Sequence, residues 1–250
     1  MPALPELLAD PAMIVTLAVA VVAGMVRGFA GFGAALVFMP VAAASLGPAV
    51  ASPSLLLFDA VLALPLTLGA LRSARLATVL PMAAGAVAFV PLGAYALVHA
   101  DAAALRWGVC AIVFVALALL ASGLRWPGPP RPGPSLGVGA AAGFMGGLAQ
   151  ISGPPVVVYL LGGSRPAAET RANLFVFFGC NTVVTLVAYA VAGLFTARVV
   201  ATALVVGPAY ALGLFTGSRL FARASEAFYR RLAFALILAA GVAGLPVWGW

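Results

Sequence analysis

The sequence predicts an all-helical, polytopic membrane protein made of two inverted repeats, each a broken, re-entrant helical hairpin followed by three transmembrane helices. Three observations support this prediction. The 250 residues are 64% hydrophobic and only 8% charged, whereas soluble domains are about 45–50% apolar and ~25% charged. Glycine-rich breaks interrupt apolar runs at matching places in the two halves of the chain. The arginines fall almost entirely on one predicted side of the membrane.

The first apolar segment, residues 13–46, is broken by a glycine-rich stretch. Four glycines and an arginine fall within ten residues there: Gly24, Arg27, Gly28, Gly31 and Gly33. Glycine costs a helix about 1 kcal/mol relative to alanine, and a central arginine costs a spanning helix roughly 2.5–3.5 kcal/mol. The arms at residues 13–26 and 34–46 are each roughly 20 Å long, short of the ~30 Å hydrocarbon core. We therefore predict a hairpin that enters the membrane and returns.

Three spans and a linker complete the predicted first half. The spans are expected at residues 51–71, 76–98 and 103–121. A stretch with five prolines follows at residues 123–135, and proline-rich sequence is stiff and extended. We expect no helix in this linker, which joins a first repeat at residues 1–122 to a second at residues 136–250.

The second half repeats this order. Its broken segment, residues 136–163, has a second arm of only ten residues, 154–163. Further spans are predicted at residues 172–195, 199–218 and 228–250. At an offset of 119 positions, Gly24 falls on Gly143, Gly28 on Gly147 and Gly33 on Ser152. Two broken apolar segments in corresponding positions indicate the binding site of a secondary transporter.

Arginine positions decide the predicted topology. All 13 basic residues are arginine and lysine is absent, which excludes Schiff-base chemistry. If both broken segments are re-entrant, ten arginines share one side, Arg106 and Arg198 take the other, and Arg27 lies within the membrane. Basic residues concentrate in cytoplasmic loops, so we expect a cytoplasmic linker and two periplasmic termini. The net charge of +7 therefore indicates orientation, and we expect no nucleic-acid partner.

The two breaks form the predicted substrate site. Helix N-termini near Ala34 and Pro154 offer partial positive charge and unpaired N–H groups, and prolines suit a helix's first turn. We expect the two N-termini to reach the midplane from opposite sides and, with Arg27, to bind a small anion. The predicted substrate-binding residues are Arg27, Gly28, Gly31, Gly33, Gln150, Ser152, Gly153 and Pro154. The glycine pairs Gly24/Gly28 and Gly143/Gly147 also allow a simpler role in close helix packing.

Two polar residues at equivalent repeat positions predict ion coupling. Asp59 is the only carboxylate within a predicted span, and Asn181 aligns with it at an offset of 122. Asp59 is the natural carrier of a proton or a sodium ion, although an ion pair with Arg27 is an open alternative. Asn173 and Thr185 are expected to form hydrogen bonds between helices. Cys110 and Cys180 are expected to be small buried hydrophobes, and His99 alone offers no imidazole cluster, so no metal or other cofactor is expected.

The chain resembles the TauE/SafE-type sulfite exporter family, also called the toluene-sulfonate uptake permease family. The resemblance covers nearly the whole chain and rests on Gly24–Gly33 followed by Pro40, on Gly143–Pro155 with its Ser-Gly-Pro-Pro, and on the segment Arg171–Phe178. It implies a bacterial inner-membrane transporter of a small anion, often sulfite or an organosulfonate. It also implies that the family glycines correspond to Gly24, Gly28, Gly31, Gly33, Gly143, Gly147 and Gly153.

The predicted function is secondary transport of a small, sulfur-containing anion across the lipid bilayer. The sequence leaves the coupling ion open between a proton and sodium, and a homo-oligomer is compatible with it. No Gly-x-x-x-x-Gly-Lys-Ser/Thr motif for ATP is present. An anion channel is the nearest alternative. A membrane-embedded protease is more remote, because Ser152 lies at the predicted midplane and His99 at the outer end of a span.

Overall fold

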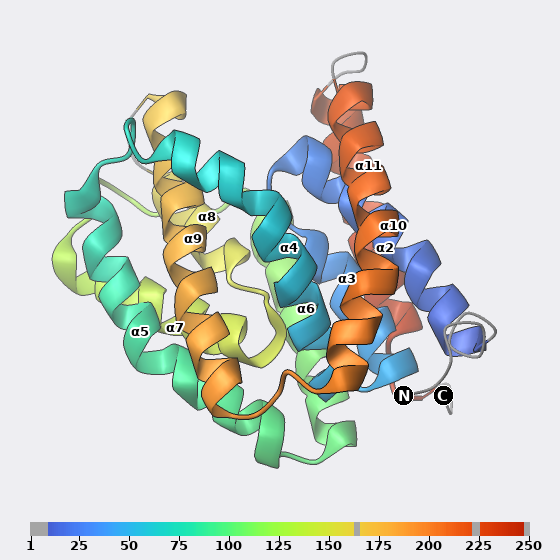
Figure 1. The fold of residues 1–250 in the computed structure, drawn as a ribbon. Coiled ribbons are helices and arrows are strands. Elements are labelled where there is room, and N and C mark those ends of the chain that lie inside the picture. Colours follow the sequence, from blue (N-terminus) through green and yellow to red (C-terminus); the bar gives the residue numbers. More distant parts are fainter. Residues whose placement is uncertain (1–9, 163–165, 222–225, 248–250) are drawn as a thin grey trace. The chain divides into compact units, whose positions relative to one another are not determined.

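The structure is a computed structural model that describes residues 10–162, 166–221 and 226–247. Within these ranges every regular element is a helix, which confirms the predicted all-helical fold (Figure 1). The helices are α2 (Pro11–Ala30), α3 (Ala34–Leu46), α4 (Pro48–Ala70), α5 (Leu76–His99), α6 (Ala102–Ala121), α7 (Pro132–Ala149), α8 (Gly153–Leu160), α9 (Ala167–Val191), α10 (Ala197–Phe221) and α11 (Glu226–Ala243).

Helix length and hydropathy confirm a polytopic membrane protein. In the described part of the chain, six helices are long and apolar enough to cross a membrane: α2, α4, α5, α6, α9 and α10. Helices α3 and α8 are short, with 13 and 8 residues. Eleven residues of α3 are buried, and a helix that is apolar on all sides belongs inside a protein or a membrane.

Helix α9 shows how the spans are oriented toward lipid and protein. Its outward stripe, Val183, Val187 and Val191, is 60%, 60% and 86% exposed. The polar residues of the same helix, Asn181, Thr185 and Tyr189, are buried and recur at the same four-residue spacing. Polar groups are costly in lipid, so this inside-out pattern is that of a transmembrane helix with its polar face against protein.

The helices form two compact units, and each unit contains segments from both predicted repeats. The first unit contains Met1–Phe58, Ala100–Leu117 and Leu194–Trp250, and the second contains Asp59–His99 and Ala118–Gly193. The predicted repeat boundaries therefore do not coincide with the compact units. The prediction that the two halves are inverted copies of each other stays a prediction.

In each unit, a glycine-mediated helix contact joins a helix of the first predicted repeat to a helix of the second. In the first unit a methyl group at Gly24 or Gly28 would collide with the α10 backbone at Tyr210 and Leu214. In the second unit a methyl group at Gly143 or Gly147 would collide with the α5 backbone at Ala86 and Val90. The register is the same in both helix pairs. Gly24 and Gly28 meet two α10 residues that are four positions apart, and Gly143 and Gly147 meet two α5 residues that are also four positions apart. The packing alternative for these four glycines is confirmed.

Several predicted helix bounds need correction. Helix α2 has 20 residues and continues through Gly24 and Gly28 to Ala30, so the expected break at residues 27–33 shrinks to Gly31–Gly33. A 20-residue helix is about 30 Å long, so the first arm is long enough to cross a membrane. The packing of both glycines against α10 compensates for their low helix propensity.

The linker is also shorter than predicted. Helix α7 begins at Pro132, inside the stretch expected to lack helix, because proline at the first helical position loses no hydrogen bond. Helix α11 ends at Ala243, where Gly244 packs against the backbone of Pro40. The predicted segment ends at residues 163 and 250 lie outside the described residues. The remaining predicted spans agree with α4, α5, α6, α9 and α10 to within five residues.

The linker docks onto the end of α8 through Tyr159. The Tyr159 hydroxyl accepts a hydrogen bond from the backbone N of Arg131 at 3.0 Å, lies 2.8 Å from Ser135 Oγ and donates to the Arg131 carbonyl at 3.2 Å. The backbone N of Trp126 donates to the Val158 carbonyl at 3.2 Å. The Trp126 ring also lies edge-on to the Tyr159 ring. The short helix α8 is therefore held at its C-terminal end by the linker.

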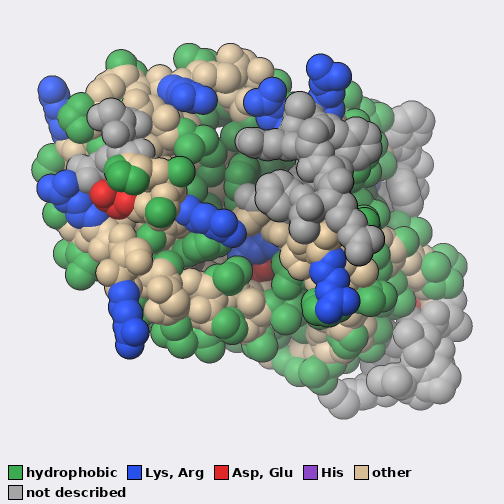
Figure 2. All heavy atoms as spheres, turned by 90° about the horizontal axis from the view of Figure 1, so that it is seen from above, with side chains coloured by type: hydrophobic (Ala, Val, Ile, Leu, Met, Phe, Trp, Pro, Cys, Tyr) green, Lys and Arg blue, Asp and Glu red, His purple; other side chains and the backbone are tan. Residues whose placement is uncertain are grey.

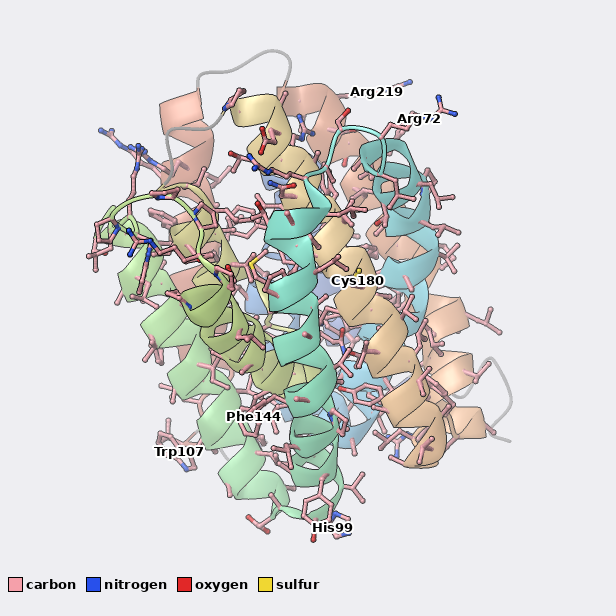
Figure 3. All side chains as sticks on the ribbon, turned by 90° about the vertical axis from the view of Figure 1, so that its left-hand side faces the viewer. Arg72, His99, Trp107, Phe144, Cys180 and Arg219 are labelled. Carbon is pink, nitrogen blue, oxygen red and sulfur yellow. The ribbon has the colours of Figure 1, made fainter. Side chains whose placement is uncertain are left out.

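Charge is distributed unevenly over the surface. Arginine side chains are far more visible than acidic ones on the face seen in Figure 2. In the second unit, Arg72 and His99 lie at opposite ends (Figure 3). In the first unit, Arg219 and Trp107 lie at opposite ends in the same view. Each unit therefore has one of these arginines at one end and the other labelled residue at the opposite end, and the predicted membrane orientation stays a prediction.

Candidate functional site

The break between α2 and α3 lies in the first unit and has three residues. The backbone N of Gly31 caps α2 by donating to the Arg27 carbonyl at 2.9 Å. Gly31 and Gly33 have φ values of 75° and 93°, which L-residues with side chains rarely adopt. The two glycines therefore allow the chain to stop one helix and start the next within three residues.

The start of α3 is a helix N-terminus in a buried setting. Gly33 precedes it and provides no side-chain cap. A helix leaves its first N–H groups without intrahelical partners, which here include those of Ala34 and Ala35. Both residues are buried, and the partial positive charge of a helix N-terminus acts more strongly away from water. The arrangement suits a small anion.

Arg27 and Gly28 occupy the last turn of α2, and both are half-buried. Arg27 keeps its positive charge because a guanidinium does not deprotonate in proteins. Gly28 packs against Leu214 and Ser218 of α10. The structure therefore gives Gly28 a packing role, and its predicted contact with substrate stays a prediction.

The break between α7 and α8 lies in the second unit and has a different chemistry. Gln150 ends α7 with φ 60°, the only positive φ of a non-glycine residue in the described ranges. Its backbone N donates to the Gly146 carbonyl at 2.9 Å, and the Ile151 backbone N donates to the Met145 carbonyl at 3.3 Å. Ser152 is buried and precedes the first residue of α8, Gly153.

The start of α8 offers fewer hydrogen-bond donors than predicted. The helix begins at Gly153, so Pro154 and Pro155 occupy its second and third positions. Proline has no backbone N–H. Gly153 therefore supplies the only N–H group of these three positions, and the expectation of several free amides at this helix start is wrong. The two breaks are chemically unequal.

Helix α9 places a polar cluster against the end of α7. The side chain of Asn181 is 3% exposed, and its Oδ1 is buried without a hydrogen-bond partner. A methyl group at Gly146 would stand 2.6 Å from Asn181 Nδ2 and 3.3 Å from Oδ1. The Asn181 amide therefore lies directly on the last turn of α7.

Tyr189 extends this cluster by two helical turns. Its hydroxyl donates to the Gly147 carbonyl at 2.7 Å and accepts from Gln150 Nε2 at 3.3 Å. Thr185 lies between them and donates to the Asn181 carbonyl at 2.7 Å. The structure thus brings Gln150, Asn181 and Tyr189 together around the end of α7.

The other predicted polar residues have separate positions. Asp59 is half-buried in α4, and the structure does not test its predicted role in coupling. Asn173 Oδ1 accepts a hydrogen bond from the Arg75 backbone N at 2.7 Å, which caps the start of α5. Cys110 and Cys180 are free cysteines. His99 stacks on Tyr95 at the exposed end of α5, whereas Ser152 is buried.

Sequence reasoning missed two buried tyrosines, Tyr159 and Tyr189. A signal existed for Tyr189, because it follows Asn181 and Thr185 at four-residue spacing on one helix face. No comparable pattern marked Tyr159. The predicted meeting of the two breaks at one anion site joins residues of different units and stays a prediction.

Comparison with known proteins identifies the family. The model of the family described as "Sulfite exporter TauE/SafE" matches residues 16–244. No curated protein matches the chain, and no solved structure matches it. The family match covers both breaks and nine of the described helices from end to end, α3 to α11. The chain belongs to the TauE/SafE sulfite exporter family.

Proposed function

We propose that this protein is a secondary transporter of a small, sulfur-containing anion, such as sulfite or a sulfonate, in a bacterial inner membrane. The family match and the six membrane-spanning helices support this proposal. The observation that carries it is the α2–α3 break, where Arg27 precedes an uncapped, buried helix N-terminus.

Arg27 and the amides of Ala34 and Ala35 are the proposed ligands of the anion. Glycine at positions 31 and 33 lets the anion approach the backbone closely. The α7–α8 break of the second unit, with Gln150, Ser152, Gly153 and Pro154, presents hydrogen-bond acceptors and apolar surface more than positive charge. We assign Asp59 and Asn181 to coupling, and both termini to the periplasm.

Flux measurements test this proposal. Purified protein in proteoliposomes is expected to show saturable uptake and counterflow of sulfite, thiosulfate or a sulfonate. Charge-assisted hydrogen bonds contribute about 1.5–3 kcal/mol, so Arg27→Gln is expected to weaken anion affinity by roughly ten- to a hundredfold. Arg72→Gln is the matched control, because Arg72 is exposed outside the helices.

Two results would contradict the proposal. Flux that never saturates and shows no counterflow would identify a channel. An anion affinity that is unchanged in folded Arg27→Gln protein would remove Arg27 from the site.

A further inference from the structure

The end of α7 has the chemistry of a cation site. A helix C-terminus carries partial negative charge and leaves its last carbonyl groups without intrahelical partners. No basic residue lies in the last turn of α7. The cap amides bond the carbonyls of Met145 and Gly146, and Tyr189 bonds that of Gly147. The carbonyls of Leu148 and Ala149 come next, at the very end of the helix.

An unsatisfied oxygen lies against the same turn. Asn181 Oδ1 is buried without a partner, and a buried polar atom in that state costs free energy until a ligand completes it. The amide has room there because Gly146 has no side chain, and a methyl group at that position would collide with it. A buried acceptor attracts a hydrogen-bond donor or a cation.

The next residues along the chain disfavour an anion at this place. Pro154 and Pro155 remove two of the N–H groups that a helix start normally offers. Ser152 adds a buried hydroxyl oxygen between the two helices. The oxygen atoms gathered here are carbonyl, amide and hydroxyl groups, and none of those named is a carboxylate.

We propose that the α7–α8 break binds a sodium ion through Asn181 Oδ1, the Leu148 and Ala149 carbonyls and Ser152 Oγ. Divalent cations in proteins usually take carboxylate ligands, whereas broken transmembrane helices bind monovalent cations with neutral carbonyl oxygens. The proposal builds on the transport function proposed above, because it makes sodium the ion whose gradient drives the anion. It also gives the two breaks different tasks, anion binding in the first unit and cation binding in the second.

Thermal unfolding of the purified full-length protein tests the site without any anion substrate. A ligand that binds only the folded state stabilises it by RT ln(1 + c/Kd), where c is the ligand concentration, and this stabilisation keeps rising with the logarithm of c. The melting temperature is expected to rise with the logarithm of the NaCl concentration once sodium exceeds its dissociation constant, and to stay constant when choline chloride replaces NaCl at equal ionic strength. Asn181→Leu removes the oxygen at similar volume and is expected to weaken the apparent sodium affinity at least tenfold.

A matched control comes from the same helix. Asn173 is also a fully buried asparagine of α9, but its Oδ1 is already bonded to the Arg75 backbone. Asn173→Leu is expected to lower the melting temperature in every salt and to keep the full response to sodium. If Asn181→Leu does not fold, Asn181→Asp replaces it, and its added charge is expected to tighten sodium binding at least tenfold.

The outcomes separate this inference from the proposed function. An absent sodium response in the wild type, or an equal response in Asn181→Leu, would overturn the sodium site. An unchanged sodium affinity in Asn181→Asp would overturn it as well. A sodium response that depends on Asn181, in a protein without anion flux, would support the site and contradict the transport proposal.

Discussion

At the scale of single residues, glycine has its main role in helix contact. Gly28 was predicted to touch substrate, and the structure places it where a methyl group would meet the backbone of Leu214 and Ser218. Gly24 makes the same kind of contact one turn earlier with Tyr210. The missing side chains allow two helix backbones to approach closely, which is how small residues stabilise helix pairs in membranes.

Gly28→Ala is expected to destabilise the protein by several kcal/mol, because the added methyl group overlaps backbone that cannot rotate away. Gly108→Ala is the control, since a methyl group at Gly108 meets nothing within 4 Å. That change is expected to be neutral or to stabilise α6 by up to about 1 kcal/mol. Melting temperature and the monodisperse fraction in size-exclusion chromatography measure both effects. Equal behaviour of the two variants would refute the packing role.

The sequence identified part of the candidate site at this scale. Arg27, Gly31, Gly33 and Asn181 are recognisable because each is out of place in an apolar helix. The hydrogen bond from Tyr189 to Gly147 was not predictable, because it depends on which helices are neighbours. The shortage of N–H donors at the start of α8 follows from Pro154 and Pro155 in its first turn, and the sequence alone already contains it.

At the scale of elements, the short helix α8 depends on the linker. It has eight residues, and isolated helices of that length are unstable in water and need tertiary contacts. The Tyr159 hydroxyl and the Trp126 backbone supply such contacts at its C-terminal end. A linker predicted only to connect two repeats thus also positions one side of the candidate sodium site.

Tyr159→Phe is expected to lower the free energy of unfolding by about 1–3 kcal/mol, because the buried Ser135 hydroxyl and the part-buried backbone of Arg131 lose a hydrogen-bond partner. The control is Tyr95→Phe, which removes a hydroxyl from a side chain that is 63% exposed. That change is expected to stay within about 0.5 kcal/mol. Thermal melts of both purified variants provide the measurement. A Tyr159→Phe protein as stable as the wild type would argue against the docking role.

Element bounds were predictable where hydropathy alone decides them. Spans such as α5 and α6 begin and end where apolar runs do, within a residue of the prediction. Bounds at glycine and proline were less predictable, because both residues have two uses. Glycine ends a helix at Gly31 yet stays helical at Gly28, and proline starts α7 at Pro132 inside a stretch expected to be extended.

At the scale of the whole molecule, the arginine distribution predicts orientation. Reporter fusions provide the test: alkaline phosphatase is expected to be active when fused after Trp250, and green fluorescent protein to be fluorescent when inserted at Gly128. Gly128 suits insertion, since it has φ 93° and nothing lies within 4 Å of a methyl group placed there. The positive-inside tendency is the physical reason for both expectations. A fluorescent C-terminal fusion would contradict the predicted topology.

The packing of helices from different predicted halves could not be predicted from the glycine offset. Glycines at equivalent positions predict a repeat, whereas only the structure shows that α2 packs with α10 and that α5 packs with α7. Sequence similarity between the two predicted repeats does not indicate whether a helix packs against its own repeat or against the other repeat. The compact units consequently differ from the predicted repeats.

This packing between predicted halves has a consequence for how the protein is made. A ribosome adds about 5–20 residues per second, and α10 follows α2 only near the other end of the chain. The glycine face of α2 therefore remains without its α10 partner, in the insertion machinery or in lipid, until most of the protein has been synthesised. Helices α5 and α7 are separated by α6 alone, so they can pair early. We expect the second unit to assemble first during translation, and the first unit to close only when α10 has been inserted.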